Sequence, residues 1–254
     1  MPFGALARLP RSWPAVYTRP IGIRQERLVS APSPPASEPA ASVASVEGID
    51  AADLRAALLR ARRAVDRHAA ALTRLDAVLG DGDHGDNLST GFRAVEELLA
   101  ELPPTMPPGD LLRAVGHRLV ATVGGASGPL LGTAFIEAGF RAGDADTLRP
   151  PLVAEMFVAA AAGLARRGRC AVGDKTILDT LGPAAEAFAA TVSTGGSGAA
   201  AQRAALVAAR AGMRSTRPLI ARRGLALRLG ERSIGHLDPG AVSCFVLLLA
   251  MAER

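Results

Sequence analysis

The feature that most constrains the fold is a helical spacing of apolar residues that begins near residue 49. In the first segment the apolar positions alternate steps of four and three residues: Leu54, Leu58, Ala61, Val65, His68, Leu72 and Leu75. This spacing predicts one face of a long helix, and Asp50 suits its N-cap. Because His68 shares the apolar stripe, we interpret it as a core or boundary histidine rather than a ligand.

The rest of the chain predicts further helices and few strands. The predicted helices cover residues 87–101, 109–123, 128–142, 150–168, 174–192, 197–213 and 239–253. Pro129 and Pro239 suit first-turn positions, and other prolines mark the loops. Alternating patterns typical of β-strands are scarce, so the sequence predicts an all-α fold of about eight helices.

Composition indicates one sizeable domain that follows a different kind of segment. Of the 254 residues 49% are hydrophobic, which suffices for a full core, but only 4% are aromatic, so alanine must fill much of it. Residues 31–42 are rich in proline, alanine and serine, as disordered linkers are. We therefore predict a disordered extension over residues 1–47, interpreted as non-functional or as a mis-called start rather than a transit peptide, and a folded domain over residues 48–254.

Charge and cysteine content narrow the class of protein. The net charge is +5 and the pI about 10.4, but the arginines are spread along the chain and no dense basic run with stacking aromatics occurs. We therefore expect no nucleic-acid partner. No stretch reaches the roughly 18 apolar residues of a membrane span. Cys170 and Cys244 are isolated thiols, which fits a reducing cytoplasm.

The most informative motif is an acidic loop, LDAVLGDGDHGDN, at residues 75–87. Asp76, Asp81, Asp83 and Asp86 place four carboxylates within eleven residues, and such a cluster repels itself unless a cation neutralises it. Carboxylate oxygens suit a hard cation such as Mg²⁺ or Ca²⁺, and the spacing does not fit an EF-hand. We take Asp76, Asp81 and Asp83 as the metal ligands. The loop therefore predicts a metal–nucleotide site rather than a capped acidic turn.

This loop and three other glycine-marked segments lie near predicted helix starts, where free N–H groups favour anions. In the acidic loop we expect Asn87 to cap the next helix and His84 to reach a phosphate. The second segment, VGGASGP, ends just after Ser127, whose hydroxyl can bind a phosphate. It is neither a nucleophile elbow nor a Walker A loop, and taken alone it better fits a tight turn between helices.

The third and fourth segments also read as helix starts. In the third, Asp174 suits a cap, with Lys175 and Thr176 in the first turn. Lys175 is the only lysine in the chain. Because a cation is unfavourable at a helix N-terminus, Lys175 indicates either an anionic partner or an ion pair with an aspartate that joins two helices. In the fourth segment, Asp238 and Pro239 fit an N-cap and the first helical residue.

Together these segments resemble a known family. The motifs LDAVLGDGDHGDN, VGGASGPLLGTAF, GDKTILDTLGPA and GERSIGHLDPGA, in this order, are similar to those of the nucleotide-binding subunit of dihydroxyacetone kinase, the L-type domain. The resemblance runs from about residue 49 to the C-terminus, so residues 48–254 would form an L-type nucleotide-binding kinase domain. It implies an antiparallel eight-helix barrel that holds ADP or ATP at one end through two Mg²⁺ ions.

The resemblance also implies roles for individual residues. The metal ligands would be Asp76, Asp81 and Asp83. The nucleotide contacts would be His84, Gly85, Asp86, Asn87, Ala126, Ser127, Gly168, Ile177, Asp238, Pro239 and Gly240. Metal ions that bridge phosphates and aspartates stabilise the charge spread during phosphoryl transfer. No covalent nucleophile is needed, and no residue is assigned as catalytic.

The resemblance implies a partner as well. A branch of the family that acts on fatty acids has Gly-Asp-Thr-Gly in the acidic loop, whereas this chain has Gly-Asp-His-Gly around His84, which favours the sugar-kinase branch. There the small ketose is bound by a K-type domain. Since we find no second domain in this sequence, we expect a separate K-type dihydroxyacetone-binding subunit. The phosphoryl donor is left open between free ATP and a phosphotransferase-system phosphocarrier.

One departure from the family pattern leaves other functions open. Leu225 stands where the family has an arginine that contacts the nucleotide, and Arg223 or Arg228 would have to compensate. Otherwise the affinity for nucleotide would be lower. The alternative interpretations are a nucleotide-binding regulatory module without turnover and a metal-dependent phosphohydrolase.

Overall fold

The structure is a computed structural model that describes residues 48–253. The extension predicted over residues 1–47 lies outside the described residues, as does Arg254. The described chain is helical throughout. Its elements are α2 (Ala51–Leu79), α3 (His84–Glu101), α4 (Pro108–Thr122), α5 (Ser127–Ala142), α6 (Pro150–Gly168), α7 (Leu178–Ser193), α8 (Gly198–Ser215), the 3-10 helix η1 (Leu225–Ser233) and α9 (Pro239–Ala252).

The prediction of an all-α fold is confirmed. Each predicted helical segment corresponds to one α-helix, and within the described part of the chain extended pairing is limited to one bridge between Ile49 and Leu148. Asp50 is the N-cap of α2, as predicted, and its side chain accepts from the Asp53 N–H at 2.8 Å. Pro239 occupies the first turn of α9.

Two local expectations were wrong, and one helix was missed. Asn87 does not cap α3, because the helix already begins at His84 with Asp83 at the N-cap position. The helix predicted from residue 174 begins only at Leu178, because Lys175 has a φ of +64°, which lies outside the helical region. The helix η1 was not predicted from its sequence, which contains the kinked Gly230.

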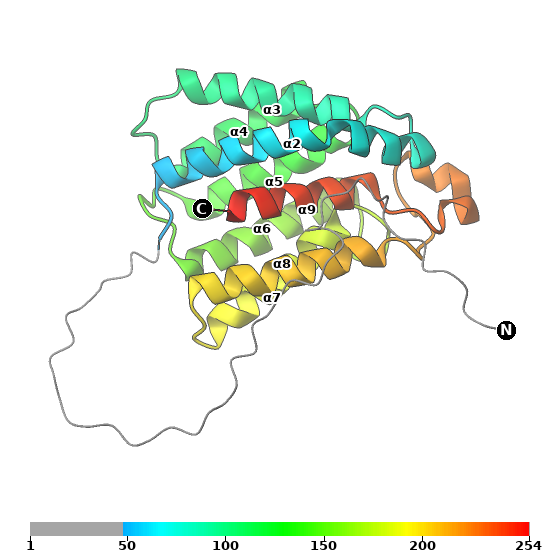
Figure 1. Cartoon of the computed structure of the whole chain (residues 1–254). Coiled ribbons are helices and arrows are strands. Elements are labelled where there is room, and N and C mark those ends of the chain that lie inside the picture. Colours follow the sequence, from blue (N-terminus) through cyan, green and yellow to red (C-terminus); the bar gives the residue numbers. More distant parts are fainter. Residues whose placement is uncertain (1–47, 254) are drawn as a thin grey trace, which may run out of the picture. The chain divides into compact units, whose positions relative to one another are not determined.

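The eight α-helices form a closed antiparallel ring (Figure 1). Each helix packs against the next one along the chain, and α9 packs against α2 to complete the ring. Arg60 of α2 supports the closure by donating to the Ala250 and Met251 carbonyls of α9. Gln202 of α8 donates to the Ala252 carbonyl at 2.7 Å. These contacts confirm the expected helical barrel.

The alternation of direction places four helix N-termini at one end of the barrel. The helices α3, α5, α7 and α9 begin at this end, which also carries η1 and lies at the right in Figure 1. The positive ends of the helix dipoles therefore converge where the acidic loop lies.

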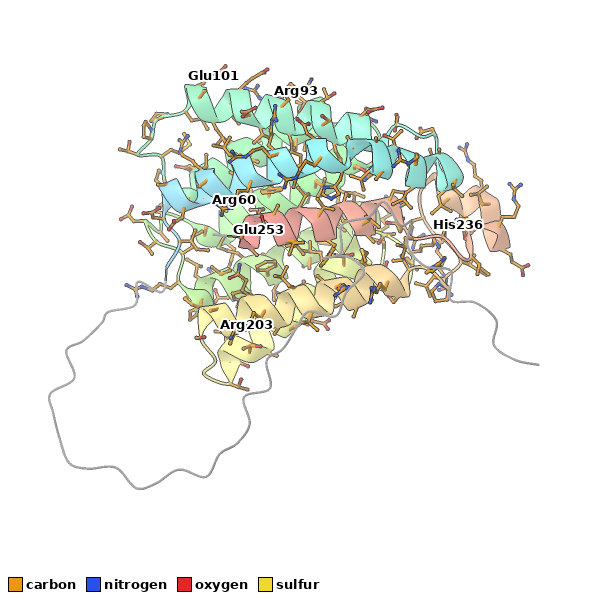
Figure 2. All side chains as sticks on the ribbon, viewed as in Figure 1. Arg60, Arg93, Glu101, Arg203, His236 and Glu253 are labelled. Carbon is orange, nitrogen blue, oxygen red and sulfur yellow. The ribbon has the colours of Figure 1, made fainter. Side chains whose placement is uncertain are left out.

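Charged side chains such as Arg93 of α3 and Arg203 of α8 point outward from the ring (Figure 2).

The helices α4 and α5, which share an extensive interface, approach each other closely at glycines. A Cβ atom added at Gly116 would lie 2.6 Å from the Gly132 carbonyl oxygen, and one added at Gly139 would lie 2.6 Å from the Gly109 carbonyl oxygen. The glycines of each helix are seven residues apart, so they face the partner helix together. The small residues therefore bring the two backbones together without an intervening side chain.

Within residues 48–253, none of the helices has both the length and the apolar character that a membrane crossing requires.

We expect Gly116→Ala to lower the free energy of unfolding by about 2 kcal/mol, because the new methyl group meets backbone that cannot move aside. Gly163→Ala is the control. There the nearest atoms belong to the Glu137 side chain, which can shift, and the change should stay within about 1 kcal/mol because alanine favours helix over glycine. Urea unfolding monitored by circular dichroism measures both. Equal losses in the two variants would contradict the role given to the α4–α5 contact.

Candidate functional site

The acidic loop between α2 and α3 is organised by one of its own carboxylates. Asp76 lies in the last turn of α2, and its Oδ2 accepts from the backbone N–H groups of Gly82, Asp83 and His84 at 3.0, 3.1 and 3.3 Å. Gly82 has a φ of +79°, which lets the chain turn back over Asp76. Asp76 therefore acts as the anchor of the loop.

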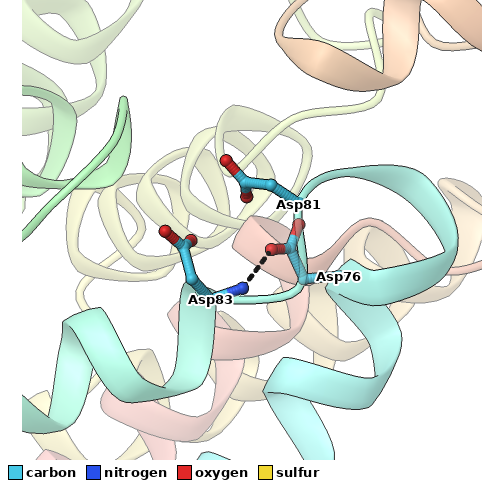
Figure 3. Close-up of side chains that lie close together, drawn as sticks. All are labelled: Asp76, Asp81 and Asp83. Carbon is cyan, nitrogen blue, oxygen red and sulfur yellow. Dashed lines mark hydrogen bonds between the residues drawn. The ribbon is translucent and has the colours of Figure 1, made fainter.

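This anchoring brings the three predicted metal ligands together (Figure 3). Carboxylate oxygens of Asp76, Asp81 and Asp83 all lie within 4.8 Å of one another, with Asp76 half-buried and the other two exposed. In the described part of the chain no arginine forms an ion pair with any of them. Three carboxylates offer only oxygen ligands, and their negative charge is not balanced by an ion pair within residues 48–253. Such a group fits a hard divalent cation such as Mg²⁺.

His84, the first residue of α3, connects three helix starts. Its Nε2 lies 2.9 Å from Ser243 Oγ of α9, and its Nδ1 lies 3.1 Å from Ser127 Oγ of α5. Because the Ser243 hydroxyl donates to the Gly240 carbonyl, Nε2 donates to Ser243 Oγ. Burial lowers the pKa of His84, against the opposing effect of Asp76 and Asp83. Both ring nitrogens are thus engaged within the protein.

The rest of the first turn of α3 has mixed surroundings. A Cβ atom on Gly85 would lie 2.0 Å from the Ala69 carbonyl oxygen, so Gly85 packs directly on α2. Asp86 is exposed. Asn87 lies beside the second glycine segment, since a Cβ atom on Gly124 would lie 2.7 Å from Asn87 Oδ1. The expected nucleotide contacts of this turn therefore face different directions.

The expected contacts on α5, α6 and α7 lie at the same end of the barrel. Ala126 is the N-cap position of α5 and Ser127 its first residue. Gly168 is the last residue of α6, and a Cβ atom there would lie 3.1 Å from Leu130 of α5. Ile177 precedes α7 and is buried.

The start of α9 completes this end. Asp238 is the N-cap, as predicted, and its Oδ2 accepts from the Ala241 N–H at 2.7 Å. Burial raises the pKa of Asp238 to about 7. A Cβ atom on Gly240 would lie 3.5 Å from the Ile177 backbone nitrogen, and Thr180 of α7 donates to the Ala241 carbonyl. The structure therefore brings the expected residues of α3, α5, α7 and α9 to one end.

Lys175 has neither of the two partners considered from the sequence. Its side chain is 2% exposed, and Nζ donates to the backbone carbonyls of Thr216, Leu219, Ser233 and His236. The interpretation of Lys175 as one half of an ion pair with an aspartate is therefore wrong. The interpretation that its ammonium is exposed to bind an anionic partner is wrong as well. The ammonium binds carbonyl oxygens of the chain that leads to α9.

The role expected for Asp174 also differs. Asp174 does not cap a helix; its Oδ2 accepts from the Ala171 N–H and pairs with Arg223 at 3.4 Å. The residue that orders the turn before α7 is Asp179, which is fully buried and accepts from the Gly173 and Thr176 N–H groups. The helix start therefore shifts from residue 174 to Leu178.

Sequence reasoning missed several residues that shape the site. Ser243 is a polar side chain in the otherwise apolar α9, Thr180 follows Asp179 in α7, and both hydroxyls are buried. The isolation of Ser243 in an apolar segment is the signal that could have identified it, since buried hydroxyls need partners. Asp179 lay within a predicted helix and gave no comparable signal.

The structure distinguishes the two arginines that were considered as replacements for the family arginine at position 225. Leu225 is exposed at the start of η1. Arg223 is engaged with Asp174, whereas Arg228 is exposed and forms no ion pair within the described residues. Of the two arginines that could replace the missing cation, Arg228 is therefore the one whose charge is not already paired.

The chain is similar to known proteins of one family. The family model described as the DAK2 domain matches residues 78–253. The chain is 42% identical to "PEP-dependent dihydroxyacetone kinase 2, ADP-binding subunit DhaL" of Listeria innocua, with 72% of this chain and 85% of the relative covered. It is 41% identical to "PEP-dependent dihydroxyacetone kinase, ADP-binding subunit DhaL" of Escherichia coli, with 72% and 88% covered.

A solved structure shows the same architecture. The dihydroxyacetone kinase of C. freundii in complex with AMP-PNP and Mg²⁺ superposes with a TM-score of 0.61 at 25% identity, over 88% of this chain and 38% of that chain. The matched segment of the family model includes Asp81 and Asp83, and Asp76 lies two residues before it. The chain belongs to the DAK2-domain family.

Proposed function

We propose that this chain is the nucleotide-binding subunit of a dihydroxyacetone kinase. In this proposal it binds Mg-ADP or Mg-ATP and transfers a phosphoryl group to dihydroxyacetone, or to a similar small ketose or aldose, held on a separate K-type subunit. The observation that carries the proposal is the group of three carboxylates within 4.8 Å, placed where four helix N-termini converge. The names of the relatives, ADP-binding subunits of dihydroxyacetone kinases, support it.

Asp76, Asp81 and Asp83 would hold the metal, and we propose two Mg²⁺ ions. When bound, Mg²⁺ supplies positive charge that stabilises the phosphoryl oxygens during transfer. The protein would contribute fixed geometry, because Asp76 is already held by three backbone N–H groups. Two divalent ions would neutralise the three carboxylates and part of the pyrophosphate.

The nucleotide would lie over the helix N-termini beside the metal site. Its phosphates would be bound by those N–H groups of the first turns of α3, α5 and α9 that Asp76 and Asp238 do not already accept. His84 would contribute by holding the Ser127 and Ser243 hydroxyls in place through its two ring nitrogens. No side chain of the chain is needed as a covalent nucleophile in this scheme.

The phosphoryl donor divides the proposal into two routes. Either free ATP exchanges at the site, or bound ADP is rephosphorylated by a phosphotransferase-system phosphocarrier. The relatives are named as subunits of PEP-dependent kinases, and this favours the second route. Incubation of the ADP-bound protein with labelled ATP separates them, since a nucleotide that does not exchange excludes the simple ATP-dependent route.

A regulatory module that binds nucleotide without turnover is the second candidate, and the exposed Leu225 favours it. Activity of the chain with a cognate K-type subunit would exclude this function. A metal-dependent phosphohydrolase would instead release phosphate from ATP without a partner.

We also propose that the protein is cytoplasmic and that its nucleotide site lies wholly within residues 48–254. Removal of residues 1–47 should therefore leave nucleotide binding unchanged.

The proposal is tested first by calorimetric titration of nucleotide-free protein with ADP. We expect binding in the presence of Mg²⁺ that disappears when EDTA is added, because the carboxylates would otherwise repel the pyrophosphate. Binding that persists in EDTA would show that the carboxylates do not form the site. No binding under either condition would remove the nucleotide-binding function.

The aspartates should separate into two classes. We expect Asp81→Asn to weaken Mg-ADP binding at least tenfold, about 1.4 kcal/mol, with an apo melting temperature equal to or above that of the wild type, because one repelling charge is removed. Asp76→Ala should weaken binding and also lower the apo melting temperature, since three backbone N–H groups lose their acceptor.

Calorimetry and thermal unfolding of the two variants measure these effects. A lower apo melting temperature in Asp81→Asn than in Asp76→Ala would contradict the anchoring role of Asp76.

A further inference from the structure

The chain between α8 and α9 folds around a single buried cation. We call residues 216–238 the cap segment; it includes η1 and lies at the end of the barrel with the acidic loop. Few of its side chains are buried, with Ala221, Ser233 and Leu237 among them. Its internal order therefore depends mainly on polar contacts.

The central polar contact is the ammonium group of Lys175. Nζ lies 2.9 Å from the Thr216 carbonyl oxygen, 3.2 Å from that of Leu219, 2.8 Å from that of Ser233 and 2.6 Å from that of His236. Two of these acceptors lie near the start of the cap segment and two near its end. One atom thus holds together parts of the chain up to twenty residues apart.

The backbone at Lys175 is strained to make this arrangement. Its φ of +64° is a left-handed conformation that a long side chain rarely adopts. Such conformations persist where surrounding contacts compensate for them, and the four carbonyls provide that compensation. Burial lowers the pKa of Lys175, while the charges of Asp238 and Asp179 oppose this effect.

The contacts of Lys175 lead directly to the start of α9. Thr216, whose carbonyl accepts from Lys175, also uses its hydroxyl oxygen to accept from the Asp238 N–H at 3.1 Å. His236, two residues before Asp238, is another of the acceptors. Lys175 therefore fixes the chain on both sides of the turn that enters α9.

We propose that Lys175 is a positioning residue for the nucleotide, which holds the cap segment and the first turn of α9 in the geometry that binds the pyrophosphate of Mg-ADP. This inference rests on the proposed function. It also explains why the only lysine of an arginine-rich chain stands here. Four carbonyls around one atom suit a compact ammonium and not a planar guanidinium.

The test is calorimetric titration of the full chain with Mg-ADP, on the wild type and three variants that circular dichroism shows to be folded. Lys175→Met keeps the side-chain length and removes the donors, and Lys175→Arg keeps the charge. Leu58→Ala is the control, because Leu58 is fully buried in α2, 18 residues before Asp76, which is about 27 Å along a helix. It destabilises the core far from the cap segment.

We expect Lys175→Met and Lys175→Arg each to raise the Kd for Mg-ADP at least tenfold, and Leu58→Ala to change it less than twofold. Wild-type affinity in Lys175→Met would overturn the inference, as would full rescue by arginine or an equal loss in Leu58→Ala. If the wild type itself does not bind Mg-ADP, the proposed function fails and this inference with it.

A second measurement needs no variant. Because Lys175 is the only lysine, reductive methylation of the wild type can modify only its Nζ and the α-amino group. We expect Mg-ADP to slow methylation of Lys175 at least tenfold relative to the α-amino group, and EDTA to abolish this protection. An unchanged rate would overturn the inference even if the Lys175 variants do not fold.

Discussion

The repulsion among three carboxylates determines much of what surrounds them. Asp76, Asp81 and Asp83 lie within 4.8 Å of one another, and no arginine of residues 48–253 forms an ion pair with them, so the protein must hold them together by other means. It does so through Asp76, whose oxygen accepts three backbone N–H groups. These donors partly compensate the charge of Asp76 and leave the two exposed carboxylates available to a cation. The loop is thus rigid at its base and charged at its tip.

The antiparallel ring supplies the other half of the electrostatic arrangement. Alternating directions place the starts of α3, α5, α7 and α9 at one end of the barrel, where their dipoles favour negative charge. Hydrogen bonds between these starts, through His84, Ser127, Ser243 and Thr180, fix their relative positions. Negative side chains and positive helix ends therefore lie at the same end of the barrel, which suits a metal ion with an anionic ligand.

Much of the fold and part of the site could be predicted from the sequence. Apolar spacing and cap residues located every α-helix of residues 48–253, and the density of aspartates identified a cluster that the structure brings together. The environment of Lys175 could not be predicted, because backbone carbonyls of a distant loop leave no pattern in the sequence. The start of α7 was misplaced for a related reason, since the buried carboxylate of Asp179 orders the preceding turn instead of continuing a helix. Ser243 was missed because its partner, His84, lies 159 residues away in the chain.

The closure of the ring by α9 and α2 has a consequence for how the protein folds. The other neighbouring pairs around the ring join helices that are consecutive in the chain, and such local contacts form quickly. The α2–α9 interface joins the first and last of the described helices, so it carries the largest loop-closure entropy of the ring. Asp76 belongs to α2 and Asp238 and Ser243 belong to the α9 region. The two sides of the site therefore meet only when the slowest contact of the fold has formed, and a partly folded chain would have most of its helices but no complete site.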